Sequence, residues 1–174
     1  ANATMSNPMQ LLVGLGNPGP QYEGTRHNAG ADFLFELAHR SHSDFKVDKK
    51  FFGLTAKVEI AGTVLHCLVP TTFMNRSGQA VGAFCSYFNI PAEGVLIAHD
   101  ELDLAPGSAK LKHGGGHGGH NGLRDIVAHL GSNAFYRLRI GIGHPGNSHA
   151  VVDYVLKKAS QTEQKLIDAT VDES

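Results

Sequence analysis

Apolar residues occur in short runs separated by polar or glycine-rich stretches, and the spacing within each run predicts a secondary-structure element. The mostly apolar run 10–15 predicts a buried strand. Apolar positions at helical spacing over 31–40 predict a helix that packs on the sheet. Alternating residues over 54–60, the turn Ala61-Gly62 and the apolar run 63–69 together predict a hairpin.

The second half of the chain continues to alternate helices and strands. Ser77 suits the N-cap of a helix with an apolar stripe, and 95–98 is a short apolar run typical of a central strand. A further stripe over 123–130, closed by Gly131, predicts another helix. Arginines alternate with apolar residues over 137–142, so we expect the last strand to have one polar face.

Hairpin-type and crossover-type connections both follow from this order of elements. Residues 41–50 are polar and are interpreted as an exposed connection, while Ser160-x-x-Glu163 is a capping box that predicts a C-terminal helix. We therefore expect an α/β fold, in which a single domain over residues 1–174 holds a twisted mixed β-sheet flanked by α-helices on both faces.

Composition limits the class of protein. A chain of 174 residues, 41% of them apolar, fits one globular domain, and residues 1–4 ahead of Met5 are interpreted as an expression remnant. No apolar run approaches the roughly 20 residues that span a bilayer, and the start lacks the pattern of a secretion signal. Cys67 and Cys85 lie in apolar runs, so we expect buried free thiols in a reducing cytoplasm.

The glycines of Gly14-x-Gly16-x-x-Gly19 match the dinucleotide-binding fingerprint literally. That fingerprint requires a helix to begin at the third glycine, so that its N-terminus meets the pyrophosphate. Here Pro20, Gly24 and a polar run intervene, and no acidic residue ends a second strand about 20 residues further on. The stretch instead predicts a rigid loop at a strand end, where α/β proteins often place catalytic residues.

Three histidines, His113, His117 and His120, are spaced closely enough to suggest a zinc site. Imidazole ligands usually project from a helix or a firm turn, whereas glycines separate these three residues. A glycine-rich loop that lets a substrate approach the main chain is therefore the preferred interpretation. Asn121 stands where the N-cap of the following helix is expected, and this role competes with a binding role.

A histidine base paired with a carboxylate is the chemistry that the loops support best. The sequence lacks a Gly-x-Ser-x-Gly elbow, and neither cysteine lies in an electropositive loop, which argues against a covalent acyl-enzyme. Polar candidates follow or precede three apolar elements: Asn17, Tyr22 and His27 after the first strand, Asn75 before the second helix, and Asp100 after the central strand. If those strands are neighbours, these groups meet at one end of the sheet.

Several segments rich in glycine, asparagine and histidine stand in order between about Leu11 and Leu156: Gly14-Leu-Gly-Asn-Pro-Gly19, Thr25-Arg-His-Asn-Ala-Gly30, Thr72-Phe-Met-Asn-Arg-Ser-Gly78, His99-Asp-Glu-Leu-Asp103, 114–122 and 137–146. Together they closely resemble bacterial peptidyl-tRNA hydrolases. The resemblance implies a monomeric, cytoplasmic α/β enzyme without a cofactor, which cleaves the ester between a peptide and the 3′-terminal ribose of tRNA. It also implies a further C-terminal helix beyond the end of this chain.

The resemblance also implies roles for individual residues. His27 matches the catalytic base, Asp100 the carboxylate that keeps it basic, and Asn17 a residue that helps to distinguish blocked from free aminoacyl groups. The other matches bind substrate: Tyr22, Phe73, Asn75 and Asn121 hold the tRNA end and the peptide, and Lys112 and Arg139 hold the tRNA 5′-phosphate. The neighbouring Lys110, Arg124 and Arg137 could add to this basic patch. Because the net charge is −1, such a local cluster rather than bulk charge has to attract tRNA.

Two other functions remain open at this point. The chain could bind tRNA or a peptide without turnover, since no covalent nucleophile is evident and basic residues cluster over 110–139. Alternatively, His113, His117 and His120 could hold a hydrolytic zinc ion. The leading hypothesis is a metal-independent esterase that acts on N-blocked aminoacyl-tRNA, with peptidyl-tRNA as its partner and with no membrane or protein partner required.

Overall fold

A seven-stranded sheet runs through the part of the chain that this computed structural model describes, residues 8–146 and 151–156. Its strands are Leu11–Gly14 (β1), Lys46–Asp48 (β2), Gly53–Ile60 (β3), Thr63–Pro70 (β4), Val95–Glu101 (β5), Ala109–His113 (β6) and Tyr136–Gly141 (β7). The helices of the described residues are Ala29–Arg40 (α1), Ser77–Phe88 (α2), Asn121–Leu130 (α3) and Val151–Val155 (α4). The helix predicted from the Ser160 capping box lies outside the described residues.

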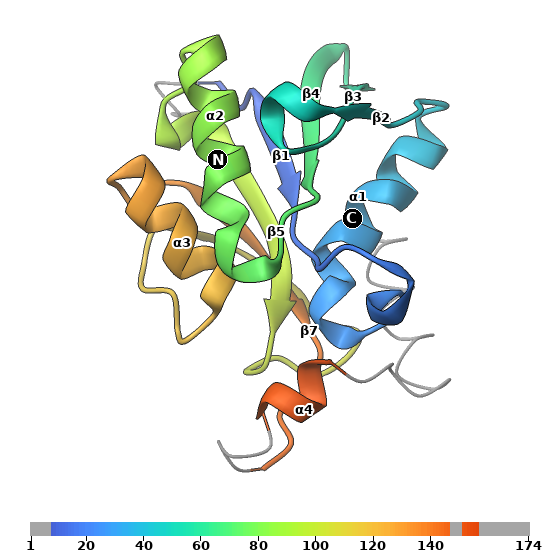
Figure 1. Ribbon diagram of the computed structural model, residues 1–174, viewed down its shortest axis with the longest axis vertical. Helices are drawn as coiled ribbons and strands as arrows, with labels where there is room; N and C mark the ends of the chain where they lie inside the picture. Colours follow the sequence, from blue (N-terminus) through green and yellow to red (C-terminus); the bar gives the residue numbers. More distant parts are fainter. Residues whose placement is uncertain (1–7, 147–150, 157–174) are drawn as a thin grey trace.

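The sheet is mixed, with parallel pairs at its centre and antiparallel pairs at both edges, and its strand order is β2-β3-β4-β1-β5-β7-β6. The four strands β4, β1, β5 and β7 run parallel to one another. β3 pairs antiparallel with β4, and β6 pairs antiparallel with β7. Helices α2 and α3 lie on one face of the sheet and α1 on the other (Figure 1). The predicted α/β fold, with a mixed sheet and helices on both faces, is confirmed.

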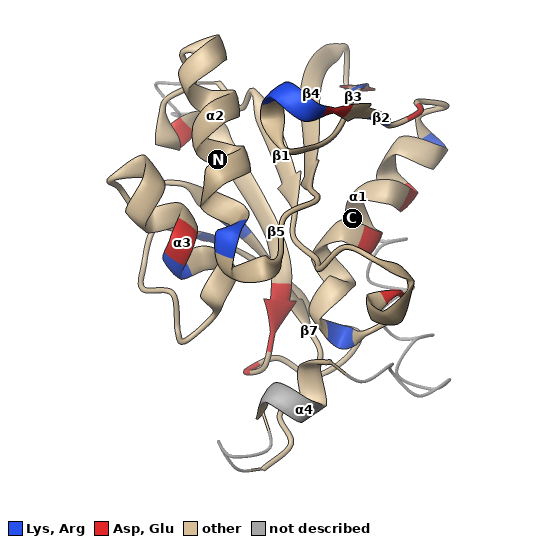
Figure 2. Cartoon of the chain, viewed as in Figure 1, with Lys and Arg blue, Asp and Glu red and all other residues tan. Residues whose placement is uncertain are grey.

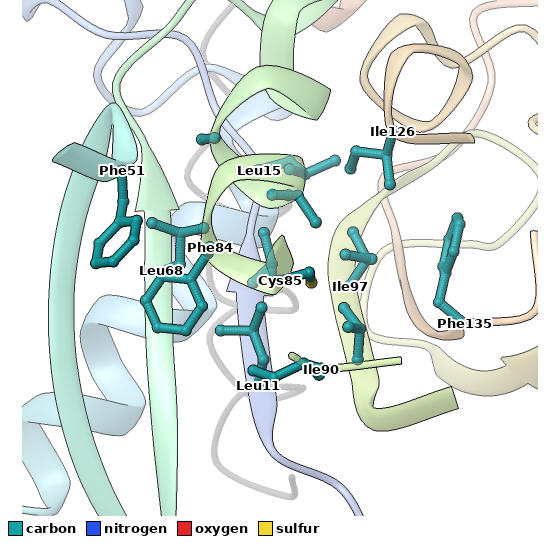
Figure 3. Packing of buried hydrophobic residues seen from close by; sticks show 14 of the residues in the cluster. Leu11, Leu15, Phe51, Leu68, Phe84, Cys85, Ile90, Ile97, Ile126 and Phe135 are labelled. Carbon is teal, nitrogen blue, oxygen red and sulfur yellow. The ribbon is translucent and has the colours of Figure 1, made fainter. Parts of the chain in front are cut away.

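Each face of the sheet carries its own apolar core. Between the sheet and the helices α2 and α3, large side chains such as Phe84, Ile97 and Ile126 are almost fully buried (Figure 3). Burying an aliphatic or aromatic side chain of this size stabilises the fold by roughly 1.5–3 kcal/mol. The opposite face is closed by α1 with Phe33 and Leu34. Together the two layers hold the sheet rigid, so its strand ends are firm supports for side chains.

The predicted hairpin is confirmed as the pair β3 and β4. Its turn residues Ala61 and Gly62 have φ angles of 52° and 82°, both in the left-handed region. Two successive residues of this kind match a hairpin turn whose twist agrees with the twist of the strands.

A close approach between α1 and β5 places the first loop beside the end of the central strand. A Cβ atom on Gly30 would lie 2.1 Å from the carbonyl oxygen of Ala98. The same carbonyl accepts a hydrogen bond from Leu15 N at 3.1 Å. Only glycine permits this contact. As a result, His27, three residues before Gly30, lies next to Asp100, two residues after Ala98.

Two local predictions were wrong. Residues 41–50 are not only a connection, because they contain β2, a three-residue edge strand. Val47 is its one apolar residue, so no apolar periodicity marks the strand in the sequence. Ser77 is the first residue of α2 rather than its N-cap, and its hydroxyl donates to the carbonyl of Met74 at 2.7 Å. Asp125 of α3 instead accepts a hydrogen bond from Gly78 N, the second residue of α2, at 2.7 Å.

Both cysteines are buried free thiols, as predicted. Burial raises the pKa of Cys67 to about 12 and that of Cys85 to about 11. Both side chains are therefore protonated near neutral pH and contribute to the apolar core rather than to chemistry. Within the described residues, no helix has the length and apolar character that a membrane crossing needs.

Candidate active site

A cleft of about 630 Å³ opens where the parallel strands β1, β4 and β5 end. Carboxyl ends of neighbouring parallel strands lie at the same edge of a sheet, where α/β proteins bind ligands. Figure 2 shows the acidic residues at this end of β5. Eight predicted site residues line the cleft: Asn17, His27, Phe73, Asn75, Asp100, Lys112, Asn121 and Arg139. The predicted meeting of the three polar loops is therefore confirmed.

His27 and Asp100 form a hydrogen-bonded pair in the cleft. His27 lies in a short 3₁₀ turn, Arg26–Asn28, immediately before α1. Its Nδ1 is 2.8 Å from Asp100 Oδ2, and the carboxylate is nearly inaccessible to solvent. Since a carboxylate can only accept here, Nδ1 of His27 carries the proton in the neutral ring. Its Nε2 is then unprotonated and is the atom able to take a proton from a reactant.

Burial and charge act in opposite directions on this pair. Burial lowers the pKa of His27, but the negative charge and the hydrogen bond of Asp100 outweigh it and raise the pKa above its ordinary value of 6.5. Burial raises the pKa of Asp100, whereas contacts with His27 and His120 hold that pKa far below its usual range. Asp100 is therefore an anion at neutral pH, and it favours the protonated form of His27.

His120 contacts the second oxygen of the same carboxylate. Its Nε2 lies 2.7 Å from Asp100 Oδ1. Its Nδ1 accepts hydrogen bonds from the main-chain N–H groups of Gly122 and Leu123, at 3.1 and 3.2 Å. A ring that accepts at Nδ1 and donates at Nε2 is the neutral tautomer. His120 thus donates a hydrogen bond to Asp100. Because the ring is neutral, the carboxylate keeps its full negative charge next to His27.

The same contacts correct the prediction for Asn121. The N-cap of α3 is His120, whose imidazole satisfies two of the free N–H groups at the helix start. Asn121 is the first helical residue, exposed and lining the cleft. Its side chain is therefore on the cleft surface rather than committed to a helix cap.

His99 lies behind the pair and is 2% exposed. Its Nδ1 donates to the main-chain carbonyl of Asp100 at 2.8 Å, and its ring packs edge-on against His120 with centroids 5.2 Å apart. Burial, followed by the proximity of His120, lowers the pKa of His99 to about 4. A neutral His99 adds no charge next to Asp100.

Asn17 is fixed by hydrogen bonds at both its main chain and its side chain. Asn28 accepts from Asn17 N at 2.8 Å and donates to Asn17 O at 3.0 Å. The side-chain Oδ1 accepts from Met74 N at 2.7 Å, which ties the first loop to the segment before α2. The amide nitrogen of Asn17 is thus the end of the side chain that is available to a ligand.

Two aromatic residues border one side of the cleft. Phe73 is 55% exposed, and Tyr22 packs edge-to-face against it, with ring centroids 6.3 Å apart. Tyr22 itself is not among the lining residues. Asn75, two residues after Phe73, is exposed on the cleft surface. This edge offers a flat apolar ring with amide groups beside it.

The basic residues near the cleft have different environments. Lys112 is exposed on β6, whereas Arg139 of β7 pairs with Glu101, with Arg139 Nε 2.9 Å from Glu101 Oε1. Burial raises the pKa of Glu101, but the hydrogen bonds from Arg139 and from the main chain of Asp103, together with nearby positive charge, outweigh it and lower the pKa. Arg137 is buried and donates to main-chain carbonyls of the glycine-rich loop, so the expectation of a polar, solvated strand face fails at this position.

The three histidines considered for zinc do not form one ligand group. His113 Nε2 lies 3.1 Å from the carbonyl oxygen of Ala134, and His117 Nδ1 accepts from Gly119 N at 3.0 Å. His120 contacts Asp100 instead. In the part of the chain that is described, the possible metal-ligating group is His27 with Asp100 and His120. Those three could bind a cation only by giving up both of their mutual hydrogen bonds.

A parallel-rich α/β sheet that carries a histidine–aspartate pair and asparagines at its strand ends has the groups that a hydrolase active site uses. The family model described as peptidyl-tRNA hydrolase matches residues 11–174 of this sequence. The chain belongs to the peptidyl-tRNA hydrolase family.

Individual relatives agree with this assignment. A peptidyl-tRNA hydrolase of Tolumonas auensis is 57% identical over 171 residues, covering 98% of this chain and 87% of that protein. One of Pseudomonas putida is 59% identical over 165 residues, covering 94% and 85%. The crystal structure of peptidyl-tRNA hydrolase from Acinetobacter baumannii superposes with a TM-score of 0.91 at 53% identity, covering 96% of this chain and 86% of that one.

Proposed function

We propose that this chain hydrolyses the ester bond of peptidyl-tRNA, with His27 as the general base that activates water and Asp100 as the carboxylate that orients it. The observation that carries the proposal is the 2.8 Å contact between His27 Nδ1 and Asp100 Oδ2 in the cleft of a chain that belongs to this family. A positioned general base accelerates such a reaction by about 10²- to 10⁴-fold.

The reaction follows from the tautomer of His27. Its Nε2 removes a proton from water as the oxygen attacks the ester carbonyl carbon, and the ring becomes an imidazolium that Asp100 stabilises. When the tetrahedral intermediate breaks down, the bond to the ribose oxygen breaks, and that oxygen takes the proton from Nε2. The products are a peptide with a free carboxylate and a tRNA with a free terminal ribose hydroxyl, and the base is regenerated.

Asn75 is the residue proposed to stabilise the oxyanion of the intermediate. It lies on the cleft surface, and its amide can donate a hydrogen bond to developing negative charge. A single donor of this kind contributes roughly 3–4 kcal/mol in hydrolases that use one. Donation from Asn75 requires no change in the protonation of any cleft residue.

Asn17 and Asn121 are proposed to select blocked substrates. Asn17 offers its amide nitrogen as a donor, and the exposed amide of Asn121 can both donate and accept, which together match the peptide bond next to the scissile ester. A free α-ammonium group carries only donors, so an acceptor–donor site leaves groups unpaired against it. Phe73, supported by Tyr22, offers a ring on which a base of the tRNA end can stack.

Lys112 and Arg139 are proposed to bind the 5′-phosphate of the tRNA. Both line the cleft, and phosphate contacts position a nucleic acid without reading its sequence. Arg139 must then share its guanidinium between the phosphate and Glu101. The affinity for tRNA is therefore expected to depend on how strongly Glu101 competes.

We also propose that the chain works in the cytoplasm as a single-domain monomer, without a cofactor or a protein partner. The support is that His27 and Asp100 already meet within this chain, and that a general-base mechanism needs no group beyond water.

The direct test is release of N-acetyl-amino acid from N-acetyl-aminoacyl-tRNA by the wild-type chain and by His27→Ala, each with and without EDTA. His39→Ala, which removes an exposed imidazole of α1, is the matched control. We expect fast cleavage that survives EDTA, is lost in His27→Ala and is kept in His39→Ala. Binding without product would favour a binding module, and loss in EDTA reversed by zinc would favour a metal enzyme.

A further inference from the structure

Arg137 occupies a position on β7 where strand alternation predicts an exposed side chain, yet it is 5% exposed. Its Nη1 donates to the carbonyl of Gly116 at 2.7 Å, and its Nη2 donates to the carbonyl of Gly114. From the other side, Asn133 Nδ2 donates to the carbonyl of Gly115 at 3.1 Å. Three successive carbonyls of one loop are thus held by side chains outside it.

In the segment held in this way, residues 114–120, the internal hydrogen bonds lie at the C-terminal end, where Gly119 N donates to His117 Nδ1 and His120 N donates to the carbonyl of His117. Gly114, Gly115, Gly118 and Gly119 all have positive φ angles, between 58° and 92°. Glycine loses more conformational entropy on ordering than any other residue, and it brings no side chain that could pack. External hydrogen bonds are therefore needed to keep one loop conformation.

The loop ends at the residue that contacts the catalytic pair. His120 closes the segment, caps α3 and donates to Asp100 Oδ1. A continuous set of contacts therefore leads from Arg137 through the loop to His120 and Asp100. If the loop moved away from β7, His120 would depend on the helix cap and on its ring contacts with His27 and His99 to stay on Asp100.

We propose that Arg137 is a positioning residue that clamps the glycine-rich loop 114–120 to β7 and thereby holds His120 on Asp100, and that it is not a ligand of a tRNA phosphate. The planar guanidinium has five donors in a fixed array and can bridge two carbonyls, which a lysine ammonium at the end of a flexible chain does not reproduce. The two carbonyl contacts also offset the cost of burying the guanidinium. The kinetic part of this inference rests on the proposed hydrolysis, while the loop clamp itself does not.

The test compares Arg137→Lys, Arg137→Gln and Asn133→Ala with the wild-type chain. Arg137→Lys keeps the charge but not the bridge, and Asn133→Ala weakens the loop without changing any charge. Lys57→Gln, at an exposed residue of β3 that does not line the cleft, is the control for removing a surface cation. Each protein is assayed on N-acetyl-aminoacyl-tRNA with its 5′-phosphate and on the same tRNA after dephosphorylation. Peptide-level amide hydrogen exchange is measured over 114–120 and over the sheet.

We expect both Arg137 variants to lose about 10- to 100-fold in kcat, as small misplacements of catalytic groups do, by the same factor on both tRNAs. Exchange is expected to rise over 114–120 and to stay unchanged in the sheet. The rise over 114–120 should be smaller in Asn133→Ala and absent in Lys57→Gln. The proposal would be overturned in favour of a phosphate ligand if Arg137→Gln lost activity only on the phosphorylated tRNA, while Arg137→Lys stayed active and its residues 114–120 exchanged as slowly as in the wild type. A uniform rise across the sheet would overturn it in favour of general stability. If even the wild-type chain cleaves neither tRNA, the proposed function fails, and hydrogen exchange still decides whether Arg137 clamps the loop.

Discussion

His120 donates from Nε2 to Asp100 Oδ1 across 2.7 Å, while the other nitrogen of the same ring caps helix α3. One imidazole therefore links the start of a helix to the carboxylate that holds His27, the proposed base. Because both of its nitrogens are engaged, the ring is fixed in one tautomer and one orientation. Asp100 in turn is held from two sides, by His27 and by His120, and its carboxylate has little freedom to rotate.

The two functions of His120 can be separated by substitution. His120→Ala removes the helix cap and the hydrogen bond to Asp100, so we expect a loss of about 1 kcal/mol in the free energy of unfolding. His120→Asn retains a side-chain oxygen suited to an N-cap but is too short to reach Asp100. Both variants are expected to lose at least about 10-fold in kcat, since a hydrogen bond to a charged group is lost. Urea unfolding and steady-state kinetics measure the two effects. Full activity in the asparagine variant would mean that only the cap matters.

Arg139 and Glu101 are expected to act in opposite directions on tRNA binding. Arg139→Gln should raise KM for tRNA that carries its 5′-phosphate, and should reduce the slope of log affinity against log salt by about 1, the effect of one phosphate contact. Glu101→Gln should lower KM, because it releases Arg139 from its ion pair. Dephosphorylated tRNA is the control substrate, on which both variants should match the wild-type KM. Equal effects on both substrates would contradict the proposed phosphate contact.

Stability should fall with acidification because of buried His99. Its folded pKa of about 4 lies below the value of 6.5 in the unfolded chain, so the unfolded state binds the proton first. The contribution of neutral His99 to the free energy of unfolding is complete above pH 6.5. It falls by roughly 3 kcal/mol as the pH decreases towards 4, at about 1.4 kcal/mol per pH unit. His27 has the opposite sign: its raised pKa contributes below pH 6.5 and is lost as the pH rises through the folded value. Urea unfolding from pH 7 to pH 4 should show a smaller drop in His99→Asn, and an equal drop would contradict this assignment.

Most of the sheet and its helices could be predicted from the spacing of apolar residues alone, because the residues that are buried recur at the period of a strand or of a helix. The run at 95–98 and the glycine at 131 mark β5 and the end of α3, and both were found where predicted. Strand β2 was missed since its three residues are polar or exposed and gain stability only from pairing with β3. A short edge strand of this kind leaves no periodic signal.

The candidate site was predictable where it depends on strand ends and not where it depends on loop contacts. His27 and Asp100 were expected to meet if the strands before them are neighbours, and β1 and β5 do pair in parallel. The role of His120 was missed because imidazole is an uncommon N-cap and its partner, Asp100, lies 20 residues away in the sequence. Alternation over 137–142 predicts an exposed Arg137, but the glycine-rich loop covers that face of the strand. Long-range loop packing of this type is absent from local patterns.

The central claim is that Asp100 sets both the tautomer and the pKa of His27, and the pH dependence of kcat/KM tests it most directly. Asp100 raises the pKa of His27 against the effect of burial, so the acid limb of the wild-type profile should lie above pH 6.5. In Asp100→Asn the negative charge is absent, so the effect of burial, which lowers the pKa of His27, is no longer opposed by it. The account predicts that the limb moves below pH 6.5 and that the maximum falls by about 10²- to 10⁴-fold. An acid limb at the same pH in both proteins would contradict the account.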